Sequence, residues 1–204
     1  MAFLISERGA ACKTFRAVEM KALMFLAEGF EEIEALTPVD VLRRAGIEIT
    51  TVAVTGGFSR NVEGSHGIVV RADVVDTDLV IDEKDYDMII LPGGMPGTKN
   101  LDNSAIVDRF IRKFHETGKY IAAICAAPMI LGKRGFLNSK KAVCYPGFEE
   151  YLRGATITGN RVERDGRVIT ACGMGAALEF ALEIVSVLDG RETAEKIASG
   201  VIAK

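Results

Sequence analysis

Short apolar runs alternate with amphipathic stretches along this chain, and no other feature limits its fold as strongly. The apolar run at residues 21–27 is followed by a helical pattern at 31–45 that ends at Gly46, and then by a second apolar run at 47–54. This alternation is typical of βαβ units and a mainly parallel sheet. A chain of 204 residues, 49% of them apolar, can bury one large core. We therefore predict a single α/β domain at residues 20–204.

The remaining elements follow from the same patterns. Apolar runs predict strands at 86–91, 120–124, 142–145, 155–158, 161–163 and 168–171, and amphipathic stretches predict helices at 104–116, 175–188 and 192–199. Residues 61–71 predict a hairpin, Asp165-Gly166 a tight turn, and Ser104 an N-cap. A further helix is expected to begin at Cys125.

Residues 1–19 differ from the rest of the chain. They have mixed polarity and weak periodicity, and they lack the apolar segment of a secretory signal. We expect an N-terminal extension that is disordered, or a start codon assigned upstream of Met20.

Composition argues against several classes of protein. The net charge of −3, without a basic stripe, argues against nucleic acid and anionic membrane as partners. No apolar run approaches the roughly 18 residues of a spanning helix. Four cysteines without Cys-x-x-Cys spacing indicate a cytoplasmic protein, and two histidines far from the cysteines give little to build a metal site, so we expect none.

Three segments with unusual residues follow predicted strands. They are residues 28–34, which hold Glu31, Glu32 and Glu34; Pro92-Gly93-Gly94; and Cys125. Because ligands bind beyond the carboxyl ends of parallel strands, we expect the three segments to meet at one edge of the sheet. Each also has a simple structural explanation: a small buried side chain for the cysteine, a turn for the glycines, and the helix dipole for the acids.

Cys125 is the strongest candidate for chemistry. A side chain at a turn from strand to helix is lifted out of the core, and the N–H groups of a helix N-terminus can lower the pKa of a thiol. Glu34 is the candidate partner, since Pro38 removes a hydrogen bond to its carbonyl and should distort the helix there. A carboxyl beside a thiolate should have a raised pKa.

Three motifs occur in this chain in an order that matches a known family. Glu31-Glu32-Ile33-Glu34 precedes the run from Pro38 to Gly46, Leu91-Pro92-Gly93-Gly94 follows, and Ala122-Ala123-Ile124-Cys125-Ala126-Ala127-Pro128 completes the set. In these residues the chain resembles the ThiJ/PfpI superfamily, in the subfamily of the human parkinsonism-associated deglycase and its bacterial ThiJ-like relatives. The resemblance covers about residues 20–202.

The resemblance implies a flavodoxin-like three-layer sandwich with a mainly parallel sheet and a nucleophile elbow, usually in a homodimer. It also implies a nucleophilic Cys125 hydrogen-bonded to a protonated Glu34, with the N–H groups of Gly94 and Ala126 forming an oxyanion pocket. Relatives are described as glyoxalases or deglycases that need no cofactor, and others as oxidative-stress sensors or chaperones.

The chain departs from the family pattern at four positions. Ala126 replaces the histidine of protease-like members, which argues against amidase or peptidase activity. Tyr145 stands where some relatives have a histidine, and it is a poor base near neutral pH. His66 matches a position that is often arginine near the dimer interface, although a solvated loop histidine is the simpler reading. Cys172 replaces an arginine or glutamine.

We therefore predict an enzyme that acts on methylglyoxal or glyoxal, or on their adducts, through a hemithioacetal of Cys125. Glu34 would transfer protons, Gly94 and Ala126 would hold the oxyanion, and Gly93, Tyr145 and His66 would lie in or behind the substrate pocket. The alternative is a non-enzymatic redox sensor or chaperone in which Cys125 is oxidised to the sulfinic acid.

Overall fold

A computed structural model of the chain describes residues 20–77 and 82–203. The predicted N-terminal extension at residues 1–19 lies outside the described residues.

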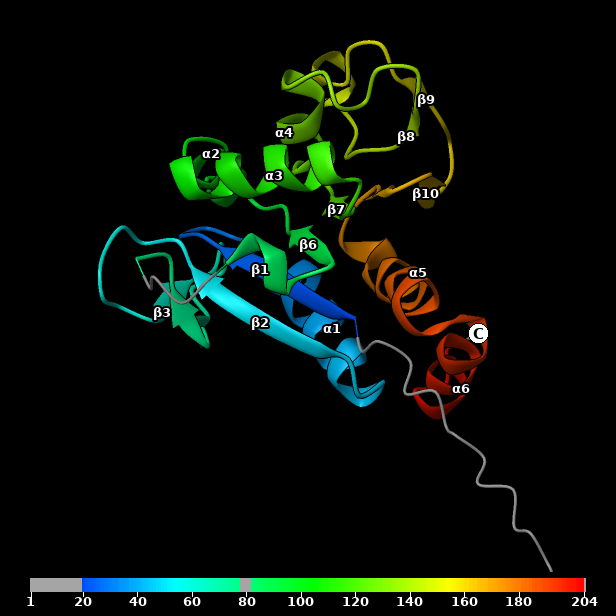
Figure 1. Cartoon of the computed structure of the whole chain (residues 1–204), viewed down its shortest axis with the longest axis horizontal. Helices are drawn as coiled ribbons and strands as arrows, with labels where there is room; N and C mark the ends of the chain where they lie inside the picture. Colours follow the sequence, from blue (N-terminus) through cyan, green and yellow to red (C-terminus); the bar gives the residue numbers. More distant parts are fainter. Residues whose placement is uncertain (1–19, 78–81, 204) are drawn as a thin grey trace, which may run out of the picture.

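A seven-stranded sheet forms the centre of the described structure (Figure 1). Its order is β10-β11-β7-β6-β1-β2-β5, and every neighbouring pair is parallel except β10 and β11. The strands are β1 (Lys21–Leu26), β2 (Glu48–Ala53), β5 (Val74–Val75), β6 (Met88–Leu91), β7 (Tyr120–Ile124), β10 (Val162–Asp165) and β11 (Val168–Ala171). The mainly parallel sheet predicted from the sequence is therefore confirmed.

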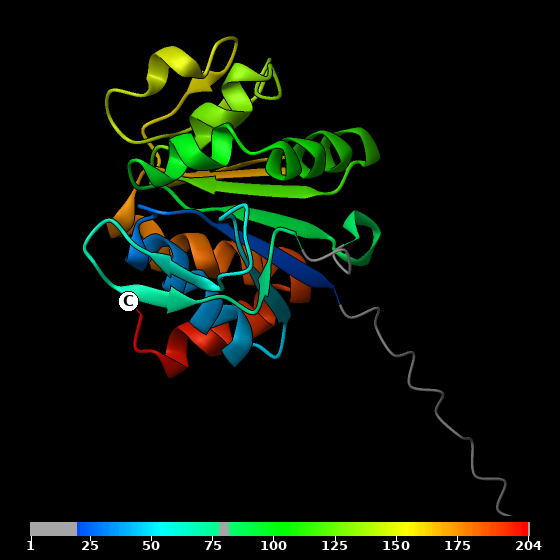
Figure 2. The ribbon, with the colours of Figure 1, turned by 90° about the vertical axis from the view of Figure 1, so that its left-hand side faces the viewer.

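Helices cover both faces of this sheet, as Figure 2 shows. One face carries α1 (Glu32–Arg44), α5 (Ala177–Asp189) and α6 (Arg191–Gly200). The other carries α2 (Gly97–Asp102), α3 (Ala105–Thr117) and α4 (Pro128–Lys133). The result is the expected three-layer, flavodoxin-like sandwich.

Small elements connect these layers. The strands β3 (Asn61–Glu63) and β4 (Val69–Arg71) form the predicted hairpin, while β8 (Lys141–Ala142) pairs with β9 (Thr156–Ile157). Three short 3₁₀ helices are η1 (Glu83–Asp85), η2 (Glu149–Tyr151) and η3 (Met174–Ala176).

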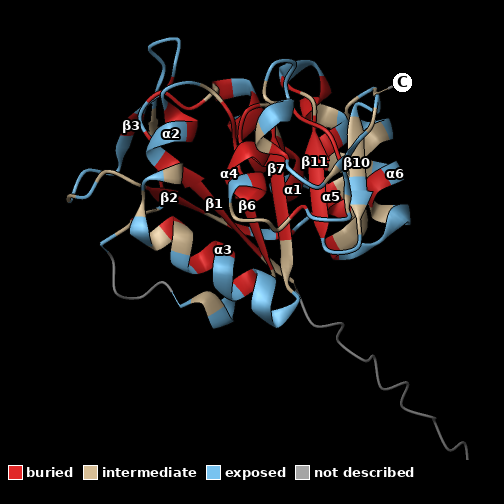
Figure 3. Cartoon of the chain, turned by 90° about the horizontal axis from the view of Figure 1, so that it is seen from above, coloured by how far each residue is buried: buried red, intermediate tan, exposed pale blue. Residues whose placement is uncertain are grey.

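The central strands are buried because both faces of the sheet are covered (Figure 3). In β1, Met24 packs toward α1 and α5, whereas Leu23 and Phe25 pack toward α3. This two-sided burial explains why β1, β6 and β7 read as nearly continuous apolar runs instead of alternating patterns.

Several predicted boundaries are wrong. The helix after β7 begins at Pro128 and not at Cys125, because Cys125 has a left-handed backbone and the next two residues form a turn. The strand predicted at 142–145 is reduced to β8, which ends at Ala142. Helix α1 continues through Pro38 without a break, and Ser104 caps α3 without a side-chain hydrogen bond.

Candidate active site

The three segments singled out in the sequence meet at the carboxyl edge of the sheet. Glu34 lies in α1, which follows β1; Gly93 follows β6; and Cys125 follows β7. On one side of β1 lies β2, and on the other side lie β6, β7 and β11 in chain order. The direction of winding therefore reverses between β1 and β6. This reversal is where ligands bind in open α/β sheets.

Cys125 occupies a sharp elbow. Its φ of 63° places it in the left-handed region, which is rare for residues other than glycine. The turn is held on both sides, because the Cys125 N–H donates to the Ala171 carbonyl at 2.8 Å and the Cys125 carbonyl accepts from the Tyr145 N–H at 2.8 Å. The N–H groups of Ala126 and Gly94 are both directed at the sulfur.

Glu34 lies beneath this elbow and is only 1% exposed. Its Oε2 accepts a hydrogen bond from the Gly93 N–H at 3.0 Å, and its Oε1 has no hydrogen-bond partner among the described residues. Burial raises the pKa of Glu34 to about 7, although hydrogen bonds with Cys125 and Gly93 act in the opposite direction. The carboxyl can therefore hold or release a proton near neutral pH.

Gly93 is the residue that lets Glu34 and Cys125 approach each other. A Cβ at this position would lie 2.5 Å from Glu34 Oε2 and 2.7 Å from Cys125 Cβ, closer than side chains tolerate. Gly94 has a φ of 86°, and a Cβ there would collide with the backbone of Glu31. The glycines thus have a packing role as well as a turn role.

The surroundings of Cys125 raise the pKa of its thiol. Burial raises its pKa, the charge of Glu34 raises it further, and the N–H groups of Ala126 and Gly94 only partly offset these effects. The expectation that backbone dipoles lower the pKa of this thiol is therefore wrong as a net effect. Because burial disfavours two negative charges in contact, Cys125 and Glu34 share a single proton above about pH 7.

A pocket of about 360 Å³ opens above the sulfur. Six residues predicted from the sequence line it: Cys125, Glu34, Gly94, Ala126, Tyr145 and His66. Four other residues, which the sequence did not suggest as pocket residues, complete the lining: Glu31, Met95, Phe148 and Met174. Gly93 lies behind the pocket against the Cys125–Glu34 pair. The Tyr145 ring covers Gly173, where a Cβ would lie 3.2 Å from Tyr145 Cδ2. The pocket thus has apolar walls around a thiol and a carboxyl.

His66 reaches this pocket from the loop between β3 and β4, but a neighbouring acid restrains it. Its Nδ1 lies 2.8 Å from Glu32 Oε2, and its backbone N–H donates to Glu32 Oε1 at 2.8 Å. Burial tends to raise the pKa of Glu32, yet hydrogen bonds from the His66 ring and from the backbone of Glu32, His66 and Ile68 together outweigh it and lower that pKa to about 2. The same contact raises the pKa of His66.

The residues Glu31, Glu32 and His66 also hold three potential metal-ligand atoms within 4.8 Å of one another, and within the described parts of the chain no other group does so. Both oxygens of Glu32 already accept hydrogen bonds from His66, so the cluster is satisfied without an ion.

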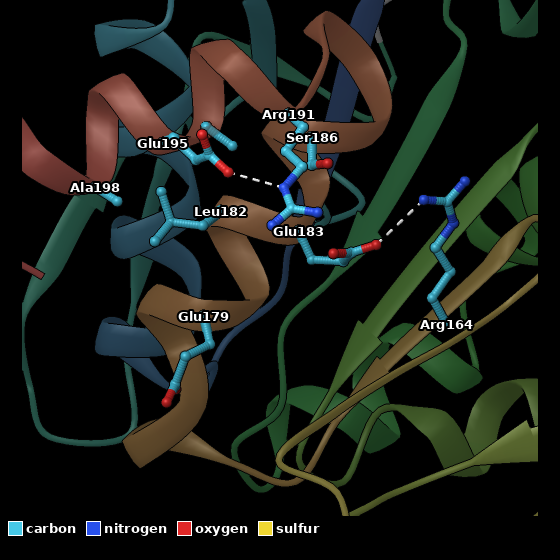
Figure 4. Close-up of a pocket in the computed structure, with 9 residues that line it drawn as sticks. Arg164, Glu179, Leu182, Glu183, Ser186, Arg191, Glu195 and Ala198 are labelled. Carbon is cyan, nitrogen blue, oxygen red and sulfur yellow. Dashed lines mark hydrogen bonds and ion pairs between the residues drawn. The ribbon is translucent and has the colours of Figure 1, made fainter. Parts of the chain in front are cut away.

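Two other hollows lack comparable chemistry. Figure 4 shows one between α5, α6 and β10, with a volume of about 480 Å³. Its two arginines are neutralised by acids, Arg164 by Glu183 and Arg191 by Glu195. The second, of about 570 Å³, has a polar lining that includes Glu28, Asp76 and Asn100. Neither is lined by a cysteine or histidine, so the pocket over Cys125 is the best candidate site.

The described residues thus form a three-layer α/β sandwich with a cysteine at a sharp elbow over a buried glutamate. Comparison with known proteins identifies the group more closely, since the model of the DJ-1/PfpI family matches residues 20–187. The chain belongs to the DJ-1/PfpI family.

Several relatives align with most of this chain. Protein dj-1beta of Drosophila melanogaster is 36% identical over 89% of the chain and 96% of its own length. The Caenorhabditis elegans protein named glutathione-independent glyoxalase DJR-1.2 is 33% identical over 86% of the chain and 92% of its own length. Protein DJ-1 homolog B of Arabidopsis thaliana is 37% identical over 94% of the chain. The chain spans less than half the length of this plant relative, 43%.

Solved structures agree with the fold. Drosophila melanogaster DJ-1beta superposes with a TM-score of 0.85 at 34% identity, covering 92% of this chain and all of that one. Oxidized Toxoplasma gondii DJ-1 superposes with a TM-score of 0.83 at 37% identity, covering 90% of this chain and 98% of that one.

No helix in residues 20–77 or 82–203 is long and apolar enough to cross a lipid bilayer.

Proposed function

We propose that this protein is a glyoxalase that needs no cofactor and converts methylglyoxal or glyoxal, or their adducts, through a covalent intermediate on Cys125. The observation that carries the proposal is the packing of the Cys125 thiol, the Glu34 carboxyl and the bare backbone of Gly93 beneath one pocket. The name of the Caenorhabditis elegans relative supports the same reaction class.

In the first step the sulfur adds to the aldehyde carbon. Proton exchange within the pair moves the Cys125 proton to Glu34, and the thiolate forms a C–S bond while the carbonyl electrons move to oxygen. The N–H groups of Ala126 and Gly94, which are directed at the sulfur, would also reach an oxyanion on the adjoining carbon. Such a donor contributes about 3 kcal/mol to transition-state stabilisation.

In the second step the hemithioacetal is isomerised. Glu34 first gives its proton to the oxyanion, which completes the neutral hemithioacetal. As a carboxylate, Glu34 then removes the proton from the carbon that carries sulfur, an enediolate forms, and Glu34 delivers the same proton to the neighbouring carbon to leave a thioester of lactate. Water then cleaves the thioester and restores the thiol. A pKa of about 7 suits Glu34 to both directions of proton transfer.

Lactate formation from methylglyoxal tests this scheme. The variants Cys125→Ser and Glu34→Gln should both lose activity, the former by on the order of 10⁴-fold because the nucleophile is replaced. Wild-type turnover by Cys125→Ser would overturn the proposal. Chiral separation of D- and L-lactate identifies the face of the enediol that Glu34 protonates.

We propose further that the protein forms a homodimer. Exposed apolar side chains gather near the start of α1 and on the adjoining hairpin: Ile33, Leu36, Ile68 and Val69. The two segments are joined, because Phe30 bridges to Gly64 and its carbonyl accepts the Ser65 N–H at 2.8 Å. An exposed apolar patch of this kind favours a protein partner, and a second copy is the expected one. Ile33→Asp should shift the sedimentation coefficient toward that of a monomer.

A cytoplasmic location is part of the same proposal. The reaction requires Cys125 to stay a thiol, and the reducing cytosol maintains thiols.

A further inference from the structure

Cys125 and Cys172 follow neighbouring strands at the same level of the sheet. Strands β7 and β11 are parallel, and their last pair is Ile124 with Ala171, so Cys125 and Cys172 are next in register. The hydrogen bond from the Cys125 N–H to the Ala171 carbonyl at 2.8 Å continues the ladder to this level. Figure 3 shows the two strands side by side.

The backbone separation expected from this register suits a disulfide. Neighbouring strands lie about 4.8 Å apart, and the Cα atoms of disulfide-bonded cysteines are about 4.4–6.8 Å apart.

Both thiols also lie on the same side of the sheet. Each is half-buried and packs against the apolar cluster between the sheet and α1, α5 and α6. By strand alternation Cys125 would share the opposite side with Ala123, but its positive φ turns the side chain away from that side. In the structure its sulfur lies beside Gly93, which follows β6 on the other side of β7 from β11, so a disulfide requires this sulfur to rotate about the Cα–Cβ bond toward β11.

We propose that Cys172 is a resolving cysteine, which forms a reversible disulfide with Cys125 when a peroxide has oxidised Cys125. This inference rests on the reactive Cys125 of the proposed function. The Cys125 thiolate attacks one peroxide oxygen, the O–O bond breaks, and a sulfenic acid and hydroxide result. Cys172 then attacks the sulfenic sulfur, the S–S bond forms, the S–O bond breaks, and water leaves with the Cys172 proton.

The disulfide would act as a protective switch. It blocks aldehyde addition while peroxide is present, and it diverts Cys125 from the sulfinic acid, which thiols do not reduce. A thiol reductant would restore the enzyme.

Peptide mapping of the peroxide-treated full chain tests the proposal. Reduced wild type is exposed to hydrogen peroxide, alkylated, digested without reductant and analysed by mass spectrometry, beside Cys172→Ser. Wild type should yield Cys125 and Cys172 peptides joined with loss of two hydrogens, and dithiothreitol should separate them. Cys172→Ser should accumulate at least about fivefold more Cys125 sulfinic acid, because the competing step is removed.

Two further variants serve as controls. Cys12→Ser and Cys144→Ala remove the other cysteines and should leave the joined peptide unchanged. The proposal is overturned if wild type and Cys172→Ser form sulfinic acid equally fast, if Cys125 joins to another cysteine, or if Cys125 is not oxidised.

Lactate formation by the reduced proteins separates the two proposals. Cys172→Ser should keep wild-type activity. Turnover without the joined peptide defeats the resolving role alone, and the joined peptide without turnover defeats the glyoxalase assignment alone.

Discussion

The substitution Glu34→Gln should stabilise the protein while inactivating it. The pKa of Glu34 rises from 4.5 to about 7 on folding, which corresponds to about 3 kcal/mol against the ionised form. Because the folded state binds this proton more tightly than the unfolded state, the free energy of unfolding falls as pH rises from about 4.5 to about 7. Above about pH 7 wild type has lost the full stabilisation of about 3 kcal/mol. A glutamine stays neutral at every pH, so the variant does not lose it.

Thermal unfolding at two pH values measures this effect. At about pH 8 the variant should melt about 6–12 °C above wild type, and the difference should shrink toward zero near pH 4, where Glu34 is protonated in both states. A melting difference that is the same at both pH values would refute the raised pKa of Glu34 in the folded protein.

Glu32→Gln provides a matched control of opposite sign. The lowered pKa of Glu32, about 2, stabilises the fold above about pH 4.5, and this contribution is lost as pH falls through about 2. The control should therefore melt below wild type at about pH 8. If both variants shifted the melting temperature in the same direction, the opposite pKa shifts assigned to Glu34 and Glu32 would be wrong.

Three further outcomes are expected for catalysis. The value of kcat/KM for lactate formation should rise with pH through about 7, since the pair of Cys125 and Glu34 must lose one proton to become reactive; a flat profile would contradict this. Gly93→Ala should reduce turnover about 100-fold by displacing both groups, whereas Gly159→Ala, where a Cβ meets no atom within 4 Å, should not. Tyr145→Phe should retain turnover within about twofold because its phenol is a poor base, and a tenfold loss would give that phenol a part in proton transfer.

The sheet was predictable because its strands are buried on both faces. The runs that became β1, β6 and β7 are too short for most helices and too apolar for loops, so their type follows from the sequence. Helix α2 and strand β5 were not predicted, since Gly97–Asp102 has no apolar stripe and Val74–Val75 is too short to show a pattern. Their positions depend on contacts with β1 and β2 that are made only in the folded chain.

The convergence of Glu34, Gly93 and Cys125 was predictable from strand ends, but the electrostatics were not. The thiol pKa depends on how deeply Cys125 and Glu34 are buried together, and burial is a property of the packed structure. The contact between Glu32 and His66 likewise joins residues 34 positions apart. Their roles in catalysis, the dimer and the extent of the domain stay predictions.

The left-handed backbone of Cys125 has an evolutionary consequence. Glycine adopts this conformation at least cost, so replacing Cys125 by glycine would relieve about 1–2 kcal/mol of backbone strain. Backbone strain alone therefore favours loss of the sulfur, and under the proposed function it is the chemistry of Cys125 that would keep it. In a lineage that no longer needs this chemistry, the elbow is the position where the reactive residue should disappear first while the fold around it persists.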